Sequence, residues 1–141
     1  IIKPLTDAKD IIFQQYDGTA VMTVEDNVSL AINNDVTVAG RGTGTQTTDN
    51  DGDFDLSVSN FFKCTPSGNI TLTFSNPAEG QSGTVMLINS GGHTISAHAS
   101  VAINADILTT LTTAGTYMLN YYCSASSGDN TILVGATGAL T

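Results

Sequence analysis

Residues 69–89, NITLTFSNPAEGQSGTVMLIN, contain two strand patterns with a loop between them. From residue 70 to residue 75 apolar and polar side chains alternate, which is typical of a strand with one buried face. Residues 85–88 form a continuous apolar run, which predicts a central strand buried on both faces. Asn, Pro, Gly and Ser fill the loop at residues 76–83, as they do in chain turns. The stretch therefore predicts a protein built on β-sheets.

Similar strand signals continue from residue 54 to the end of the chain. Apolar residues alternate or cluster at residues 54–58, 61–62, 95–103, 117–123 and 131–134. About eight strands at intervals of roughly 8–12 residues predict a two-sheet β-sandwich or a jelly-roll-like head over residues 54–141. No helix is assigned, and residues 105–112 are the one segment where a helical turn or two is considered. Leu108 and Leu111 are assigned to a short strand or edge, because the β-branched residues of 105–112 argue against a helix.

The N-terminal residues 1–40 predict a short β-meander that forms a stem or an oligomerisation segment. Four strands are expected, at residues 11–16, 20–25, 28–32 and 36–38, with a hairpin turn at Asp17-Gly18. So thin a sheet cannot bury its apolar face alone. Two interpretations are open, packing on the later domain or on copies of itself, and we favour the second, as an intertwined or side-by-side homo-oligomer. Residues 41–53 contain Gly, Thr and Asp but no apolar side chain, which predicts a linker loop between stem and head.

The composition supports an all-β protein and excludes several other classes. Of the 141 residues, 21 are Thr, 12 are Ser and 11 are Asn, and the formal charge is −9. Helical bundles need far more Glu, Lys and Arg than this chain has. Four scattered cations cannot form a basic patch for nucleic acid, and no apolar stretch approaches the roughly 20 residues of a membrane span. We therefore expect no nucleic-acid partner and no membrane insertion.

The two cysteines, Cys64 and Cys123, both lie in apolar, strand-like surroundings. Two interpretations stay open: a disulfide that joins two strands, or two buried free thiols that act as small apolar residues. Neither cysteine belongs to a Cys-x-x-Cys or a mixed Cys/His pattern, so no zinc site is expected.

Several phrases of the C-terminal part stand out: residues 69–83, the strand 84–89 with its Ser-Gly-Gly turn, residues 108–117, Asn-Tyr-Tyr at 120–122 and residues 138–141. With these phrases the segment 69–141 resembles a β module found at the C-termini of bacteriophage tail-fibre and other virion-surface proteins, including capsid-decoration proteins. Residues 11–38 resemble the β-rich stem repeats that precede such heads.

This resemblance implies a non-enzymatic structural protein of the virion, in a fibre-like surface appendage that contributes to host-surface attachment. It also implies a homo-oligomer, expected to be a trimer, with other virion proteins and a host surface glycan or protein as partners. Two alternatives stay open. One is a capsid decoration or cement protein that binds the outer capsid lattice, and the other is a carbohydrate-binding module.

The acidic residues Asp49, Asp51, Asp53 and Asp55 are a candidate calcium site, because they offer oxygen ligands on a Gly-containing loop. The spacing does not fit an EF-hand, since Gly52 would require a ligand at Thr47 and a Glu where Val58 stands. The other interpretation is a solvated acidic turn. No other metal or cofactor is expected.

No enzyme is expected. His93 and His98 are five residues apart, which would place them on opposite faces of an extended strand, and Glu25 and Glu79 are the two Glu of the chain. The two His do not suit a metal site or a catalytic base. The two Glu do not suit the carboxylate pair of a glycosidase. No catalytic residue is therefore assigned.

Tyr121 and Tyr122 are candidate partner-binding residues, because exposed aromatic rings can stack on sugars. As neighbours on a strand they must point to opposite faces, so one of them is expected outside the core or between subunits. The alternative for both is core packing.

Overall fold

The structure is a computed structural model that describes residues 11–24, 30–32 and 35–140. The chain divides into two compact units, Ile1–Gly42 and Thr43–Thr141. The described residues form β-strands and one short helix. Within these ranges no helix is long and apolar enough to cross a membrane.

The first unit contains an antiparallel meander of β1 (Ile11–Gln14), β2 (Ala20–Val24) and β3 (Leu30–Ile32). The predicted hairpin turn is confirmed. The Asp17 carboxylate accepts the backbone N–H of Thr19 at 2.9 Å, and Gly18 takes the left-handed conformation at φ 86°. A fourth strand at residues 36–38 was wrongly predicted, since this segment is exposed and unpaired with any strand. The predicted strand ends at Glu25 and at residues 28–29 lie outside the described residues.

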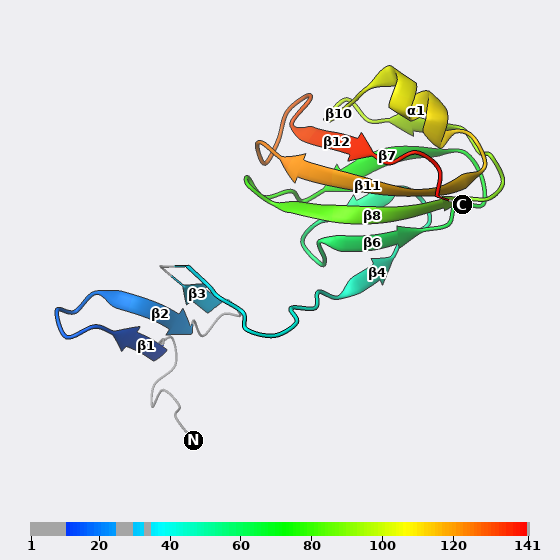
Figure 1. The fold of residues 1–141 in the computed structure, drawn as a ribbon. Coiled ribbons are helices and arrows are strands. Elements are labelled where there is room, and N and C mark those ends of the chain that lie inside the picture. The colour runs from blue at the N-terminus through cyan, green and yellow to red at the C-terminus, as the bar shows by residue number, and fades with distance from the viewer. Residues whose placement is uncertain (1–10, 25–29, 33–34, 141) are drawn as a thin grey trace. The chain divides into compact units, whose positions relative to one another are not determined.

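The second unit contains two stacked sheets and a helix. The six-stranded sheet has the order β10-β12-β11-β8-β6-β4, and the three-stranded sheet has the order β5-β7-β9. In Figure 1 the six-stranded sheet lies in front, with β7 behind it. The elements are β4 (Gln46–Thr48), β5 (Asp53–Asp55), β6 (Phe61–Cys64), β7 (Ile70–Ser75), β8 (Ser82–Asn89), β9 (Ile95–Ala97), β10 (Val101–Ile103), α1 (Ala105–Leu111), β11 (Gly115–Cys123) and β12 (Ile132–Ala136).

Most neighbouring strands of this unit run parallel because the chain alternates between the two sheets. β4, β6 and β8 lie in the large sheet, and β5, β7 and β9 lie in the small one. Each crossover between these parallel neighbours therefore passes through the opposite sheet, whereas β10 and β12, which also pair in parallel, are connected through α1 and β11. β11 then pairs antiparallel with β8 and β12. The predicted two-layer β arrangement is confirmed, but this mixed and parallel topology is not a jelly roll.

The predicted linker at 41–53 differs from the structure. Residues 46–48 form β4, which pairs in parallel with residues 61–63 of β6, and residue 53 begins β5. Thr side chains suit a half-exposed edge strand, because their branched Cβ favours extended backbone. Because residues 41–53 lack apolar side chains, the sequence did not indicate the edge strand β4.

The core of the second unit lies between the sheets and under α1. In β8, Val85, Leu87 and Asn89 are buried, whereas Met86 and Ile88 on the other face are partly exposed. The central position of this strand is confirmed, but burial on both faces is not. Its partners in the core are Phe54, Leu56, Phe62, Cys64, Ile70, Leu72, Phe74, Ile95, Val101, Leu111, Tyr117, Leu119, Tyr121, Cys123, Ile132 and Val134.

Helix α1 contradicts the prediction of a helix-free chain. The Asn104 side chain caps it by accepting the backbone N–H of Asp106 at 2.8 Å. Ile107, Leu108 and Leu111 recur at helical spacing and pack on the core. The hydroxyls of Thr109 and Thr110 donate to carbonyl oxygens four residues earlier, so these β-branched residues have their polar groups satisfied inside the helix.

Candidate functional site

The side of the six-stranded sheet that faces away from the core is the candidate functional surface, and we call it the outer face. Alternate side chains of β4, β6, β8, β11 and β12 point to this side, as the burial pattern and strand register show. Its residues are Gln46, Thr48, Phe61, Lys63, Thr84, Met86, Ile88, Thr116, Met118, Asn120, Tyr122 and Leu133.

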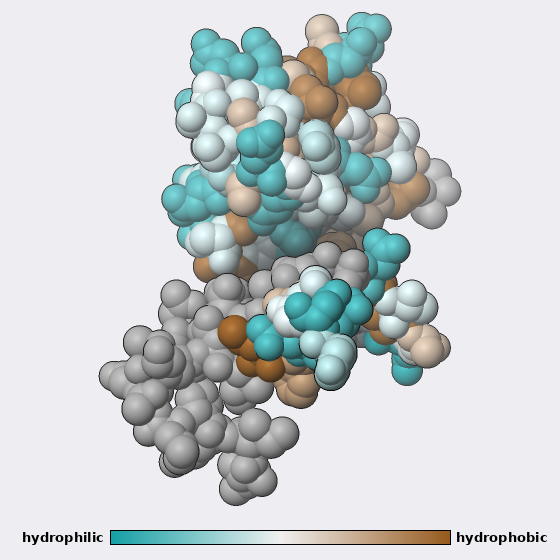
Figure 2. All heavy atoms as spheres, turned by 90° about the vertical axis from the view of Figure 1, so that its left-hand side faces the viewer, coloured by the Kyte–Doolittle hydropathy of each residue, from teal (hydrophilic) through white to brown (hydrophobic). Residues whose placement is uncertain are grey.

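The outer face mixes apolar side chains with uncharged polar ones and carries a single charge, that of Lys63. Phe61 is 43% exposed, Tyr122 49% and Leu133 47%. Lys63 is the one cation among residues 43–141, which also hold seven carboxylates. All seven lie elsewhere in this unit, on β5, in α1 and in the loops between strands. Figure 2 views the molecule from the left-hand side of Figure 1, across the edges of the sheets rather than onto the outer face, and shows hydrophobic residues (brown) at the surface among hydrophilic ones (teal).

The opposite side of the sandwich is polar. On β5, Asp53 and Asp55 flank the buried Phe54 and therefore point away from the core. On β7 and β9 the outward residues include Thr71 and Ser96, whose hydroxyls are hydrogen-bonded at 2.8 Å. The two sides of the sandwich thus differ in charge: one is acidic, whereas the outer face has no carboxylate and combines apolar with uncharged polar side chains.

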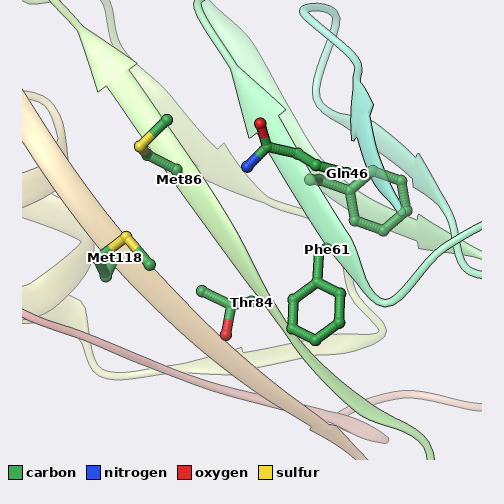
Figure 3. Close-up of a pocket in the computed structure, with 6 residues that line it drawn as sticks. Gln46, Phe61, Thr84, Met86 and Met118 are labelled. Carbon is green, nitrogen blue, oxygen red and sulfur yellow. The ribbon is translucent and has the colours of Figure 1, made fainter. Parts of the chain in front are cut away.

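A hollow of about 220 Å³ lies on the outer face. Figure 3 shows Gln46, Phe61, Thr84, Met86 and Met118 around it, contributed by β4, β6, β8 and β11. Methionine side chains are flexible and polarisable, so they adapt to an inserted apolar group. The hollow can therefore accept an apolar side chain.

The two candidate tyrosines point to opposite faces, as predicted. Tyr121 is buried, and its ring packs against Phe74 with 5.0 Å between the ring centroids. Burial, with a smaller contribution from Cys123, raises the pKa of Tyr121 to about 12. Tyr122 lies on the outer face, paired across strands with Leu133. Tyr122 is thus the one of the two that is available to a partner.

The acidic residues 49–55 use their carboxylates in local turns. The Asp51 carboxylate accepts the N–H of Asp53 at 2.9 Å, which lowers the pKa of Asp51. Burial raises the pKa of Asp49. Asp55 accepts the side chains of Asn76 at 3.0 Å and of Ser57 at 2.7 Å, and both hydrogen bonds lower its pKa. These bonds fit the predicted acidic turn, and the calcium site stays a prediction.

No group of three or more His, Cys, Asp or Glu side chains in the described ranges is arranged to hold a metal ion. His93 and His98 lie in the turns before and after β9, not on one extended strand. The ring of His98 is hydrogen-bonded to the Ser100 hydroxyl at 2.9 Å. Glu79 is exposed in the loop between β7 and β8, and Glu25 lies outside the described residues.

The cysteines are free, buried thiols. Cys64 lies beside Leu87 of β8, whereas the backbone N–H of Cys123 donates to the carbonyl of Gln81. Leu87 and Gln81 are six residues apart along the same segment, or about 20 Å. A disulfide needs Cα atoms within about 7 Å, so the free-thiol interpretation holds. Burial, together with Asp49 and Asp51, raises the pKa of Cys64 to about 12.

Sequence reasoning did not identify Phe61, Met86 and Met118 as surface residues. The run at 85–88 was interpreted as buried on both sides because all its residues are apolar. One signal was available: Thr84 continues the alternation on the side of Met86, and Thr116 and Asn120 do so beside Met118. A polar residue at the same parity marks that side as accessible.

No protein-family model matches the chain, and searches of the curated proteins and of the solved structures also found no match.

Proposed function

We propose that the chain is a non-enzymatic structural protein of a bacteriophage virion, in a fibre-like surface appendage that contributes to host-surface attachment. The outer face is the observation that supports this proposal best. A subunit of an appendage needs an extended, neutral surface for neighbouring subunits, and charged residues are depleted in the centres of such interfaces. The resemblance of residues 69–92 and 108–122 to phage surface modules supports the same role.

The proposal includes assembly as a homotrimer that also contacts other virion proteins. The described strands of the second unit give a stiff two-sheet body, and its acidic, hydroxyl-rich side keeps an assembled fibre soluble. The apolar Ile12, Phe13 and Tyr16 of the first unit are exposed, which suits a stem that packs on copies of itself.

A glycan-binding module is the second candidate function. It is favoured by Tyr122, whose ring is about half exposed, and by Asn120 and Thr84, which lie near it on the outer face and are hydrogen-bonded to each other at 3.1 Å. Stacking and amide hydrogen bonds are the contacts by which sugars are held. Binding on a glycan array that is lost in the variant Tyr122→Ala would support it, and an array without binding would count against it.

Labelled electron microscopy tests the proposal. Antibodies against residues 43–141, applied to purified particles of the encoding phage, are expected to mark a tail appendage. Label spread over the capsid shell would instead support a capsid decoration protein on the outer lattice. Particles that carry no label would contradict a virion role.

A further inference from the structure

We propose that a second copy of this chain docks on the outer face, with the Tyr122–Leu133 pair of one copy lying over the hollow beside Phe61, Met86 and Met118 of the other and one of the two side chains inserted in it. This inference rests on the proposed function, of which self-assembly is a part, and it names the surface and the contacts. It follows from the charge distribution, the shape and the size of the outer face.

The charge distribution selects a partner that is itself neutral. A basic partner would choose the acidic side of the sandwich around Asp53 and Asp55, and a polyanionic partner finds only Lys63 on the outer face. Two copies that each carry a charge of −9 repel each other on most approaches. The outer face has no carboxylate, so it allows two copies to meet without contacts between carboxylates.

The shape of the outer face supplies both halves of a contact. The hollow lies over β4, β6, β8 and β11, and the exposed pair Tyr122–Leu133 lies on β11 and β12. Tyr122 is four residues from Met118 on β11, which separates the pair from the hollow by about 13 Å. A cavity of roughly 150 Å³ can hold benzene, so 220 Å³ accommodates a tyrosine ring or a leucine side chain.

A protrusion and a hollow at different places on one face suit contact between identical copies. Each copy can give its Tyr122–Leu133 pair and receive that of a neighbour, either reciprocally in a dimer or in sequence around a closed ring. A ring of three is the arrangement that the proposed homotrimer requires.

The size of the outer face fits a stable interface. From strand spacing and rise, the six strands cover a planar footprint on the order of 500 Å². Side-chain relief adds to the accessible area, and a standard interface buries about 800 Å² per partner. The footprint is of the same order, so one face is enough for one specific contact.

The test compares single lysine substitutions in the full chain. Leu133→Lys and Met118→Lys place a cation in the proposed contact and make the chain less negative, so general repulsion cannot explain dissociation. Thr71→Lys is the matched control, because Thr71 is an exposed residue on the other side of the sandwich. Each protein is studied by sedimentation equilibrium between 1 and 50 µM, with its melting temperature measured in parallel.

We expect an oligomer for the unsubstituted chain and for Thr71→Lys, and at least tenfold weaker association for the two outer-face variants. A monomeric unsubstituted chain at 50 µM, or outer-face variants that associate as tightly as the control, would overturn the proposal. Leu133 is about half exposed within one chain, so its variant gives a clear result even where Met118→Lys impairs folding. Particle labelling tests the proposed function independently of sedimentation. If the label marks a tail appendage while both outer-face variants stay assembled, the docking contact is wrong and the proposed function stands.

Discussion

The phenol oxygen of Tyr121 donates a hydrogen bond to the backbone carbonyl of Asn60 at 3.2 Å, across 61 residues of sequence. The same carbonyl accepts the backbone N–H of Thr84 at 2.9 Å. Tyr121 thereby joins β11 to the connection between β5 and β6 from inside the core, while its neighbour Tyr122 points outward. Of these two adjacent tyrosines, the first therefore stabilises the sandwich and the second forms part of its surface.

Tyr121→Phe is expected to lower the free energy of unfolding by about 1 kcal/mol, the usual net worth of one hydrogen bond. The loss stays small because the Asn60 carbonyl keeps its bond from Thr84. Urea denaturation of the variant measures it. Tyr122→Phe is the control and should change stability by less than about 0.5 kcal/mol, as expected for an exposed residue. Equal losses in both variants would contradict the assigned roles.

Gly83→Ala is expected to destabilise the second unit by about 3 kcal/mol or more. Gly83 lies opposite Tyr121 in the register of β8 and β11, and a Cβ there would overlap the Asn60 carbonyl and the Tyr121 ring. Gly135→Ala is the control, because a Cβ on that residue of β12 meets no atom within 4 Å. It should be neutral or stabilising by roughly 0.5–1 kcal/mol. An unchanged free energy of unfolding for Gly83→Ala would contradict the close approach of Gly83 to the Asn60 carbonyl and the Tyr121 ring.

Alkaline pH is expected to weaken the fold. The folded protein keeps the protons of Tyr121 and Cys64, because the pKa of each is raised to about 12, while the ordinary values are 10.0 and 9.0. Their contribution is complete below about pH 9 and is lost as the pH rises towards 12, since the unfolded chain releases these protons first. Melting temperatures from pH 8 to pH 11.5 should fall. The melting temperature should fall less steeply with pH in Tyr121→Phe and in Cys64→Ala than in the unsubstituted chain. The same dependence on pH in all three proteins would contradict this prediction.

Most of the strands, though not β4, could be predicted from local alternation, because period two needs only neighbouring residues. Ile70–Ser75 and Gly115–Cys123 are examples, in which buried and accessible side chains alternate as the sequence indicates. The topology could not be predicted in this way. Parallel pairs such as Phe62 with Val85 arise from crossovers through the other sheet, and no local pattern records which strand lies beside which.

The helix and the outer face escaped prediction for different reasons. At residues 105–111 the helix is held by the Asn104 cap and by threonine hydroxyls that bond to the preceding turn, and these outweigh the low helix propensity of β-branched residues. On the outer face, Met86 and Met118 are apolar and therefore read as core. In the second unit no layer of the described residues covers these apolar side chains, and the polar residues of the same parity were a weaker signal than the apolar run itself, so the candidate surface needed the structure.

Asn89→Ala is expected to cost about 3 kcal/mol. Asn89 is fully buried, and its side chain donates to the carbonyls of His93 at 2.8 Å and Leu111 at 2.9 Å while accepting the His93 N–H at 2.9 Å. Removing it leaves buried backbone groups unpaired at the end of α1. Asn120→Ala is the control, because Asn120 is an exposed asparagine on β11. Thermal unfolding that separates the two variants by less than about 1 kcal/mol would contradict this role.

Calcium at 5 mM is expected to leave the melting temperature unchanged, relative to magnesium at the same concentration. Calcium takes six to eight oxygen ligands, which requires several carboxylates to converge on one point. Asp53 and Asp55 point outward on β5, whereas one oxygen of Asp51 and one of Asp49 already accept backbone N–H groups of the turn. Binding would therefore have to draw the like charges of this turn together. A calcium-specific rise of 3 °C or more that disappears in Asp51→Asn and Asp53→Asn would contradict the acidic-turn interpretation and establish the predicted metal site.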